Sequence, residues 1–115
     1  QIRVGIIEYV HSPEVQDKMN LSDYLQDKCH HEYSALSKLF TEMKAVSIER
    51  YYIAQRIEYV KQLLVYDELT ISEIAYRLHY SSVAHLSAQF KSVTGLSPTQ
   101  FKRLKNHLLR PLDEI

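Results

Sequence analysis

The sequence predicts an all-α fold of about seven helices, forming two similar subdomains joined by a long linker helix. Apolar residues recur at spacings of three and four along most of the chain, and no segment alternates convincingly with period two. Two glycines and three prolines among 115 residues are too few for a turn-rich β-sandwich or barrel. The same pattern of helices also occurs twice. We therefore expect subdomains at 1–47 and 67–115, with the linker helix at 48–66.

Three helices are expected in the first subdomain. The first ends at the turn signal Ser12-Pro13. The second begins after Asn20, whose side chain suits an N-cap, and the third follows a turn of about four residues. The apolar stripes of these helices are Ile2, Ile6, Ile7 and Val10, then Leu21, Tyr24, Leu25 and Cys29, then Leu36, Leu39, Phe40 and Met43.

Four further helices are expected, beginning with the linker. Thr70 and Glu73 have the spacing of a capping box at the start of the next helix. Gly95 can end the following helix in a left-handed conformation, and Ser97-Pro98 fits an N-cap followed by proline at the first helical position. The four apolar stripes are Ile53, Ile57, Val60 and Leu64, then Ile71, Ile74, Ala75 and Leu78, then Leu86, Phe90 and Val93, then Phe101 and Leu104.

The two subdomains repeat one another in sequence. Leu25, Cys29 and His30 recur 49 positions later as Ile74, Leu78 and His79, and five later positions recur at a distance of 50. Each copy is a short helix, a turn and a longer helix with Leu and Phe four apart on its buried side, which is the outline of a helix-turn-helix. The five positions are Leu36, Ser37, Phe40, Ala45 and Ser47, matched by Leu86, Ser87, Phe90, Gly95 and Ser97.

The second helix of such a unit enters the major groove of DNA, where its outward face reads base edges. The outward face of the first copy carries hydroxyls and one cation, which suit phosphate and base-edge hydrogen bonds. That of the second copy is mostly apolar and suits thymine methyl groups. An ordinary solvated helix face is the alternative for both. The expected DNA-contacting residues are Tyr33, Ser34, Ser37, Lys38 and Thr41 in the first copy, and Ser82, Val83, Ala84, His85, Ser87, Ala88 and Lys91 in the second.

The linker pattern covers about 18 residues, or roughly 27 Å of helix at about 1.5 Å per residue. Successive major-groove faces on one side of B-DNA lie about 34 Å apart. A stiff connector of this length would place both reading helices in adjacent major grooves of one duplex.

The charge distribution supports an anionic partner for the C-terminal half. The whole chain balances 14 basic against 14 acidic residues, which by itself argues against nucleic acid. Residues 74–112, however, contain six basic residues and neither Asp nor Glu. Lys102 and Arg103 belong to this stretch, and with Lys91 and the helix N-termini we expect them to hold the phosphate backbone.

Residues Ser72 to Leu104, "SEIAYRLHYSSVAHLSAQFKSVTGLSPTQFKRL", closely resemble the signature of the AraC/XylS family of bacterial transcription regulators. The preceding segment "LSDYLQDKCHHEYSALSKLFTEMKAVSIERYY" looks like that family's more variable N-terminal helix-turn-helix. The resemblance implies a seven-helix domain that binds double-stranded DNA in the bacterial cytoplasm and is usually attached to a separate sensing domain. It also implies RNA polymerase as a partner. The first residue is Gln1 rather than Met, and we expect the chain to be a piece of a longer protein.

Five positions depart from the family pattern. His30 and His79 stand where the family often has glycine in the turn, so each must adopt a left-handed backbone at a cost of about 1 kcal/mol or more. Lys44-Ala45 replace the usual Thr-Gly, which predicts that the preceding helix runs on. Ala88 replaces a commonly basic residue, so we expect Lys38 to carry more of the sequence specificity.

Other classes of function find little support. No apolar run approaches the roughly 20 residues that span a bilayer, and a single cysteine excludes an internal disulfide. Cys29, His30 and His31 lack a second spaced pair of ligands, so neither a zinc site nor any cofactor is expected. No phosphate loop, nucleophile elbow or paired carboxylates indicate an enzyme. The rival interpretation is a helical protein-interaction module that does not bind DNA.

Overall fold

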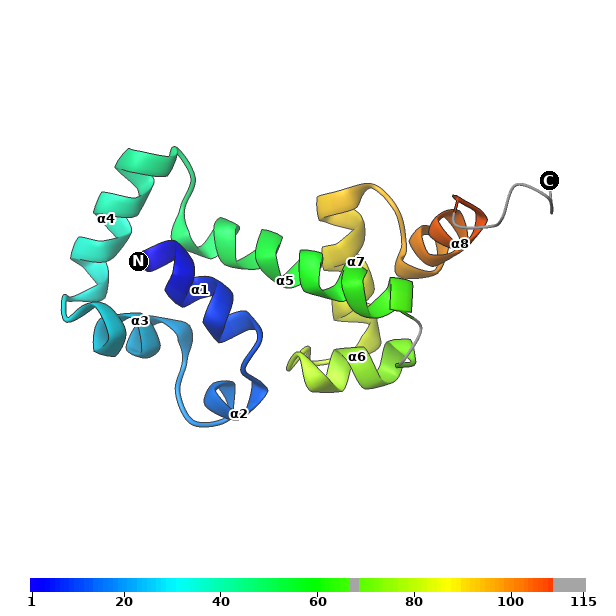
Figure 1. Cartoon of the computed structure of the whole chain (residues 1–115), viewed down its shortest axis with the longest axis horizontal. Helices are drawn as coiled ribbons and strands as arrows, with labels where there is room; N and C mark the ends of the chain where they lie inside the picture. Colours follow the sequence, from blue (N-terminus) through cyan, green and yellow to red (C-terminus); the bar gives the residue numbers. More distant parts are fainter. Residues whose placement is uncertain (67–68, 109–115) are drawn as a thin grey trace. The chain divides into compact units, whose positions relative to one another are not determined.

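The computed structural model describes residues 1–66 and 69–108, and the side chains of this part up to residue 105. The described part is all-helical, which confirms the predicted fold class, and it divides into two compact units at a point within one helix, between Arg56 and Ile57. The predicted subdomain 67–115 begins and ends outside the described residues. The helices, shown in Figure 1, are α1 (Ile2–Val10), α2 (Pro13–Gln16), α3 (Leu21–Cys29), α4 (Tyr33–Lys44), α5 (Ile48–Tyr66), α6 (Ile71–Arg77), α7 (Val83–Thr94) and α8 (Pro98–Leu108).

The short helix α2 was not expected from the sequence. The turn signal Ser12-Pro13 marks its start instead, because Pro13 occupies the first helical position, where its fixed φ suits a helix. The helix has four residues, fewer than an amphipathic pattern needs to be recognised. The described residues therefore form eight helices rather than about seven, without any change of fold class.

The first unit folds around a small core made by α1, α3, α4 and the start of α5. Helix α1 packs against α3, and α3 packs against α4. Phe40 also meets the ring of Tyr51 edge-on, with centroids 5.4 Å apart. Burying these side chains stabilises the unit by about 1.5–3 kcal/mol for each large residue. The buried core residues are Ile6, Leu25, Leu36, Phe40 and Ile48.

The second unit has a corresponding core. Helix α6 packs against α7, and α7 packs against α8, where Phe90 and Phe101 meet edge-on with ring centroids 5.5 Å apart. The capping box predicted at the start of α6 is present, since the side chains of Thr70 and Glu73 each accept a hydrogen bond from the other residue's backbone N–H. The fully buried apolar side chains of this unit include Ile57, Val60, Ile74, Leu86 and Phe90.

The structure repeats with the period that the sequence predicts. Helices α4 and α7 both have 12 residues, and α7 begins 50 positions after α4. The helices that follow them, α5 and α8, begin at Ile48 and Pro98, again 50 positions apart. In both copies the Leu and Phe four residues apart are buried. The two copies are thus the same supersecondary unit, a short helix followed by a longer one.

Three of the described residues other than glycine adopt positive φ, and two of them were expected. His30 and His79 have φ of 60° and 63°, as predicted for the two turns. The third is Ala45, at φ 60°, which shows that the prediction of a longer α4 was wrong: the helix ends at Lys44, and the Ala45 N–H donates to the Thr41 carbonyl. Ile48 immediately beyond is fully buried, and this burial offsets the roughly 1 kcal/mol cost of the left-handed alanine.

Candidate nucleic-acid interface

The outward face of α4 carries most of the residues expected to contact DNA in the first unit. Because Leu36 and Phe40 point into the core, the opposite side of the helix faces solvent. Ser34, Lys38 and Thr41 are exposed there, and Ser37 is partly buried at the edge of the face. These four side chains place three hydroxyls around one cation on this face.

Tyr33 lies at the start of α4 and is held from two sides. Its backbone N–H donates to Oε1 of Gln26 at 2.7 Å, and its hydroxyl donates to Oε2 of Glu49 in the first turn of α5. Partial burial, followed by the neighbouring Glu49 carboxylate, raises the pKa of Tyr33 well above its usual 10. The phenol therefore stays protonated and donating at neutral pH, and it joins the first turn of α4 to the neighbouring helix.

The outward face of α7 has a different chemistry. With Leu86 and Phe90 buried, Ala84, Ala88 and Lys91 are exposed. Val83 at the tip is 40% exposed, and Ser87 is partly buried. The face therefore offers methyl groups and a single cation, and apolar contact with thymine methyls stays a prediction.

Side chains also organise the start of α7. The Ser82 hydroxyl accepts a hydrogen bond from the His85 N–H at 3.0 Å and so caps the helix. The His85 ring shares a hydrogen bond with Ser81 Oγ at 3.1 Å and lies edge-on to the ring of Tyr80. Tyr80 in turn donates to Gln89 at 2.6 Å. His85 is exposed, but these contacts give its ring a defined place beside the helix start.

The stretch 74–112, which contains no acidic residue, supplies several cations to α8. Arg103 is exposed on α8, and Lys102 beside it is partly buried. Lys105 lies over the ring of Phe101, with Nζ 5.6 Å from the centroid, so its charge sits close to an apolar surface. Arg110, which completes the basic stretch, lies outside the described residues.

The sequence reasoning missed Glu42 on the reading face and two positioning residues. Glu42 is exposed on α4 four residues after Lys38, and helical spacing alone would have found it. Its carboxylate adds a negative charge to that end of α4. Gln26 and Glu49 hold Tyr33, but they come from neighbouring helices and no spacing rule connects them to α4.

Metal and membrane sites gain no support from the geometry. Within residues 1–66 and 69–108, no three His, Cys, Asp or Glu side chains are grouped so that they could hold a metal ion. Cys29 instead packs against the core of the first unit. Across the same part of the chain, no helix is both long and apolar enough to cross a bilayer.

Comparison with known proteins decides between the two candidate functions. A family model described as a helix-turn-helix domain matches residues 25–104, which run from the middle of α3 through α4, α5, α6 and α7 into α8. The chain belongs to the AraC/XylS-type helix-turn-helix family. It is a DNA-binding domain of the kind found in transcription regulators, and the interpretation as a protein-interaction module without DNA binding is set aside.

Relatives within this helix-turn-helix family are regulators of much greater length. An HTH-type transcriptional regulator of Staphylococcus aureus (strain MSSA476) is 31% identical over 123 residues, covering 89% of this chain and 16% of the relative. The regulator YtdP of Bacillus subtilis (strain 168) is 23% identical over 104 residues, covering 90% of this chain and 13% of the relative. The chain thus spans about a sixth or less of the length of these relatives.

Solved AraC/XylS-type structures have the same fold. The C-terminal domain of AraT, a response regulator from Geobacillus stearothermophilus, is 25% identical with a TM-score of 0.72, covering 90% of this chain and 84% of that one. A DNA-binding transcriptional dual regulator from Escherichia coli K-12 has a TM-score of 0.76 at 19% identity, covering 93% and 94%. The second likeness concerns the fold alone.

Proposed function

We propose that the chain recognises a specific double-stranded DNA sequence for a bacterial transcription regulator, with α4 and α7 in adjacent major grooves. The observation that carries this proposal is the structural repeat. Two 12-residue helices, 50 positions apart, each bury a Leu-Phe pair and expose the face that helix-turn-helix proteins use to read bases. Helix α5 has 19 residues, which corresponds to about 28 Å and is of the same order as the roughly 34 Å between grooves.

The two helices are assigned different roles in recognition. In α4, Lys38 is the one long cation among hydroxyls, so it carries most of the base discrimination, and Ser34, Ser37 and Thr41 add shorter hydrogen bonds. Tyr33 positions the start of this helix through Gln26 and Glu49.

In α7, the methyl groups of Val83, Ala84 and Ala88 meet thymine methyls, an apolar form of readout. Ser82 and Ser87 border this face, and His85 contacts phosphate or sugar. Lys91, together with Lys102 and Arg103 of α8, holds the phosphate backbone without reading sequence.

Further partners are proposed for the whole regulator. The matched relatives are about six times longer or more, which supports a sensing domain elsewhere in the polypeptide. We expect RNA polymerase as a further partner, because a transcription regulator acts on it, and we expect the regulator to lie in the cytoplasm, where the DNA is. The chemistry proposed for the site is binding rather than catalysis, since the exposed faces of α4 and α7 offer hydroxyls, methyl groups and cations that suit contacts with DNA.

Salt dependence tests the proposal. A duplex binder with about 6–10 phosphate contacts loses about 10³–10⁵ in affinity between about 50 and 200 mM salt. We expect a titration of random-sequence duplex with the 115-residue chain to show a slope of this size. An affinity that stays nearly constant across the series would overturn the assignment.

A further inference from the structure

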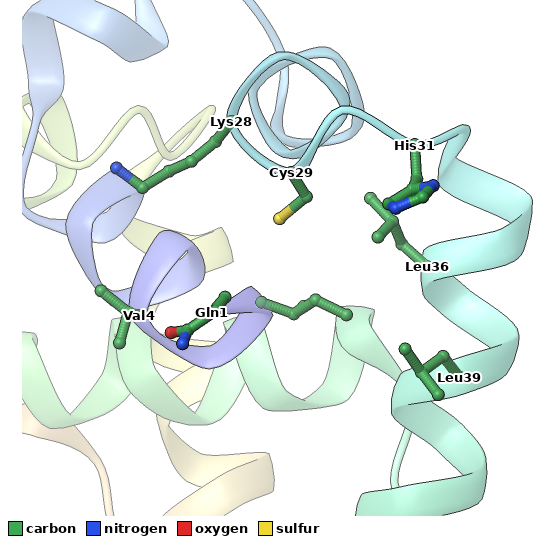
Figure 2. A pocket seen from close by; sticks show the side chains of 8 residues that line it. Gln1, Val4, Lys28, Cys29, His31, Leu36 and Leu39 are labelled. Atoms are coloured by element: carbon green, nitrogen blue, oxygen red, sulfur yellow. The ribbon is translucent and has the colours of Figure 1, made fainter.

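A hollow lined by apolar side chains lies on the first unit between α1 and α4. Its volume is about 530 Å³, and its walls come from α1, the end of α3 and α4, with Val4, Cys29, Leu36 and Leu39 among the lining side chains that Figure 2 shows. A second hollow of about 320 Å³ shares Leu39 and continues along α4 to Met43. We call the two together the α1–α4 groove.

The groove exposes more apolar surface than folding of the unit requires. Val4 is 40% exposed, Leu39 49% and Met43 72%. The second copy differs at the corresponding positions: Leu39 is replaced by Gln89, whose amide oxygen accepts a hydrogen bond from Tyr80, while Met43 is replaced by Val93. Only the leucine has a polar counterpart, since Val93 is also apolar and 46% exposed. An exposed apolar patch that the shared fold does not need is typical of an interaction surface.

The charges around the groove specify what fits there. The residues that line it include the cations Lys28, Arg3 and Lys44 and no Asp or Glu. Lys28 already pairs with Glu8 at 2.6 Å, which leaves Arg3 and Lys44 to attract an occupant. Apolar walls between cations suit an amphipathic helix whose apolar face carries acidic residues along its margins.

DNA is a poor candidate for the occupant of the α1–α4 groove. On α4, Leu39 and Met43 form one i, i+4 row, whereas Ser34 and Lys38 form another on the outward side. A phosphate backbone would find cations in the groove, but it has nothing to cover the exposed leucine and methionine.

We propose that the α1–α4 groove binds an acidic amphipathic helix from another part of the regulator's own polypeptide. This inference rests on the proposed function, in which the chain is one part of a longer protein. The matched relatives, of which this region makes up 16%, carry most of their residues elsewhere. Because the groove and the reading face share α4, an occupant of the groove acts directly on the helix that reads DNA.

Thiol labelling tests whether the groove is covered. Met43→Cys is compared with the matched substitution Val93→Cys, each combined with Cys29→Ala, in the 115-residue chain and in the full regulator. Positions 43 and 93 are both exposed, so these two substitutions disturb no core. Cys29→Ala, which removes a side chain from the groove lining and the core of the first unit, is common to all the proteins compared. We expect the thiol at position 43 to react about tenfold more slowly in the full regulator than in the short chain, because covered thiols are inaccessible, whereas the thiol at position 93 reacts equally in both.

Each other outcome has a defined meaning. Equal reactivity of the position-43 thiol in both proteins overturns the proposal, and so does concentration-dependent protection in the short chain, which points to a second copy. If the position-43 thiol of the full regulator is still protected after Arg3→Glu and Lys44→Glu are both introduced, the occupant is not acidic and the proposal is wrong. DNA titrations of the same proteins separate these results from a failure of DNA binding itself.

Discussion

The hydroxyl of Tyr33, at the first position of α4, donates a hydrogen bond to the carboxylate of Glu49 in the first turn of α5. The two residues are 16 positions apart, and their contact joins the start of the reading helix to the helix that follows it. In the second copy Val83 and Thr99 occupy these positions, so a phenol–carboxylate pair is specific to the first unit.

Tyr33→Phe removes this hydrogen bond while keeping the ring. We expect the free energy of unfolding to fall by about 1 kcal/mol, since the bond is exposed to solvent. DNA affinity should fall by about threefold to tenfold, because the start of α4 is then less well fixed. Urea unfolding and a duplex titration measure the two effects. Tyr76→Phe, at a tyrosine that is 87% exposed, is the control and should change neither.

Alkaline pH should destabilise the first unit. Burial is the main cause that raises the pKa of Tyr9, Tyr24 and Tyr33 in the folded chain above their usual value of 10. These phenols ionise more readily in the unfolded chain than in the folded one. Their contribution to the free energy of unfolding is therefore fully present below about pH 10 and is lost as the pH rises further. Unfolding titrations from about pH 8 to 11 measure this, and stability that increases above about pH 10 would contradict the burial of these rings.

Lys38→Ala should cost about 1–3 kcal/mol of binding and relax the preference at the bases under α4, since a cation contacting a guanine edge is lost. Lys91→Ala is the comparison. Lys91→Ala should weaken binding to all DNA sequences alike. It should also lower the slope of log affinity against log salt concentration by about 1, as expected for the loss of a phosphate contact. Parallel titrations of matched and mismatched duplexes distinguish the two. If affinity and preference survive Lys38→Ala, the assignment of Lys38 as base reader is wrong.

The ends of α4 and α7 offer a matched pair of substitutions. Ala45→Gly should stabilise the chain by about 1 kcal/mol, because glycine adopts the left-handed backbone without steric cost. Gly95→Ala should destabilise it by a similar amount through backbone strain alone, since φ is 83° there and an added Cβ would meet nothing within 4 Å. Thermal unfolding of both variants tests this, and a change of the same sign in both would refute it.

The parts of the fold that follow local rules were predictable from the sequence. The buried Leu36-Phe40 and Leu86-Phe90 pairs follow helical spacing, and the cap at Thr70 follows from residue type. Ala45 was mispredicted because the burial of Ile48 beyond it overrides the preference of alanine for a helix.

The candidate site was only partly accessible to sequence reasoning. The residues on the outward faces of α4 and α7 can be predicted from helical spacing once the buried Leu and Phe are identified. The contacts of Tyr33 with Gln26 and Glu49, and the α1–α4 groove, depend on which helices lie side by side. An apolar stripe indicates that a helix packs against a neighbour, but it does not show how much of the stripe that neighbour covers. The exposure of Leu39 and Met43 was therefore not predictable from the sequence.

Selection of bound sequences from random duplex DNA with the 115-residue chain tests most directly whether both reading helices engage one duplex. We predict an enriched motif of two half-sites with centres about 10–10.5 base pairs apart, one of which is lost in Lys38→Ala. A motif with a single half-site, or no enrichment at all, would contradict the account.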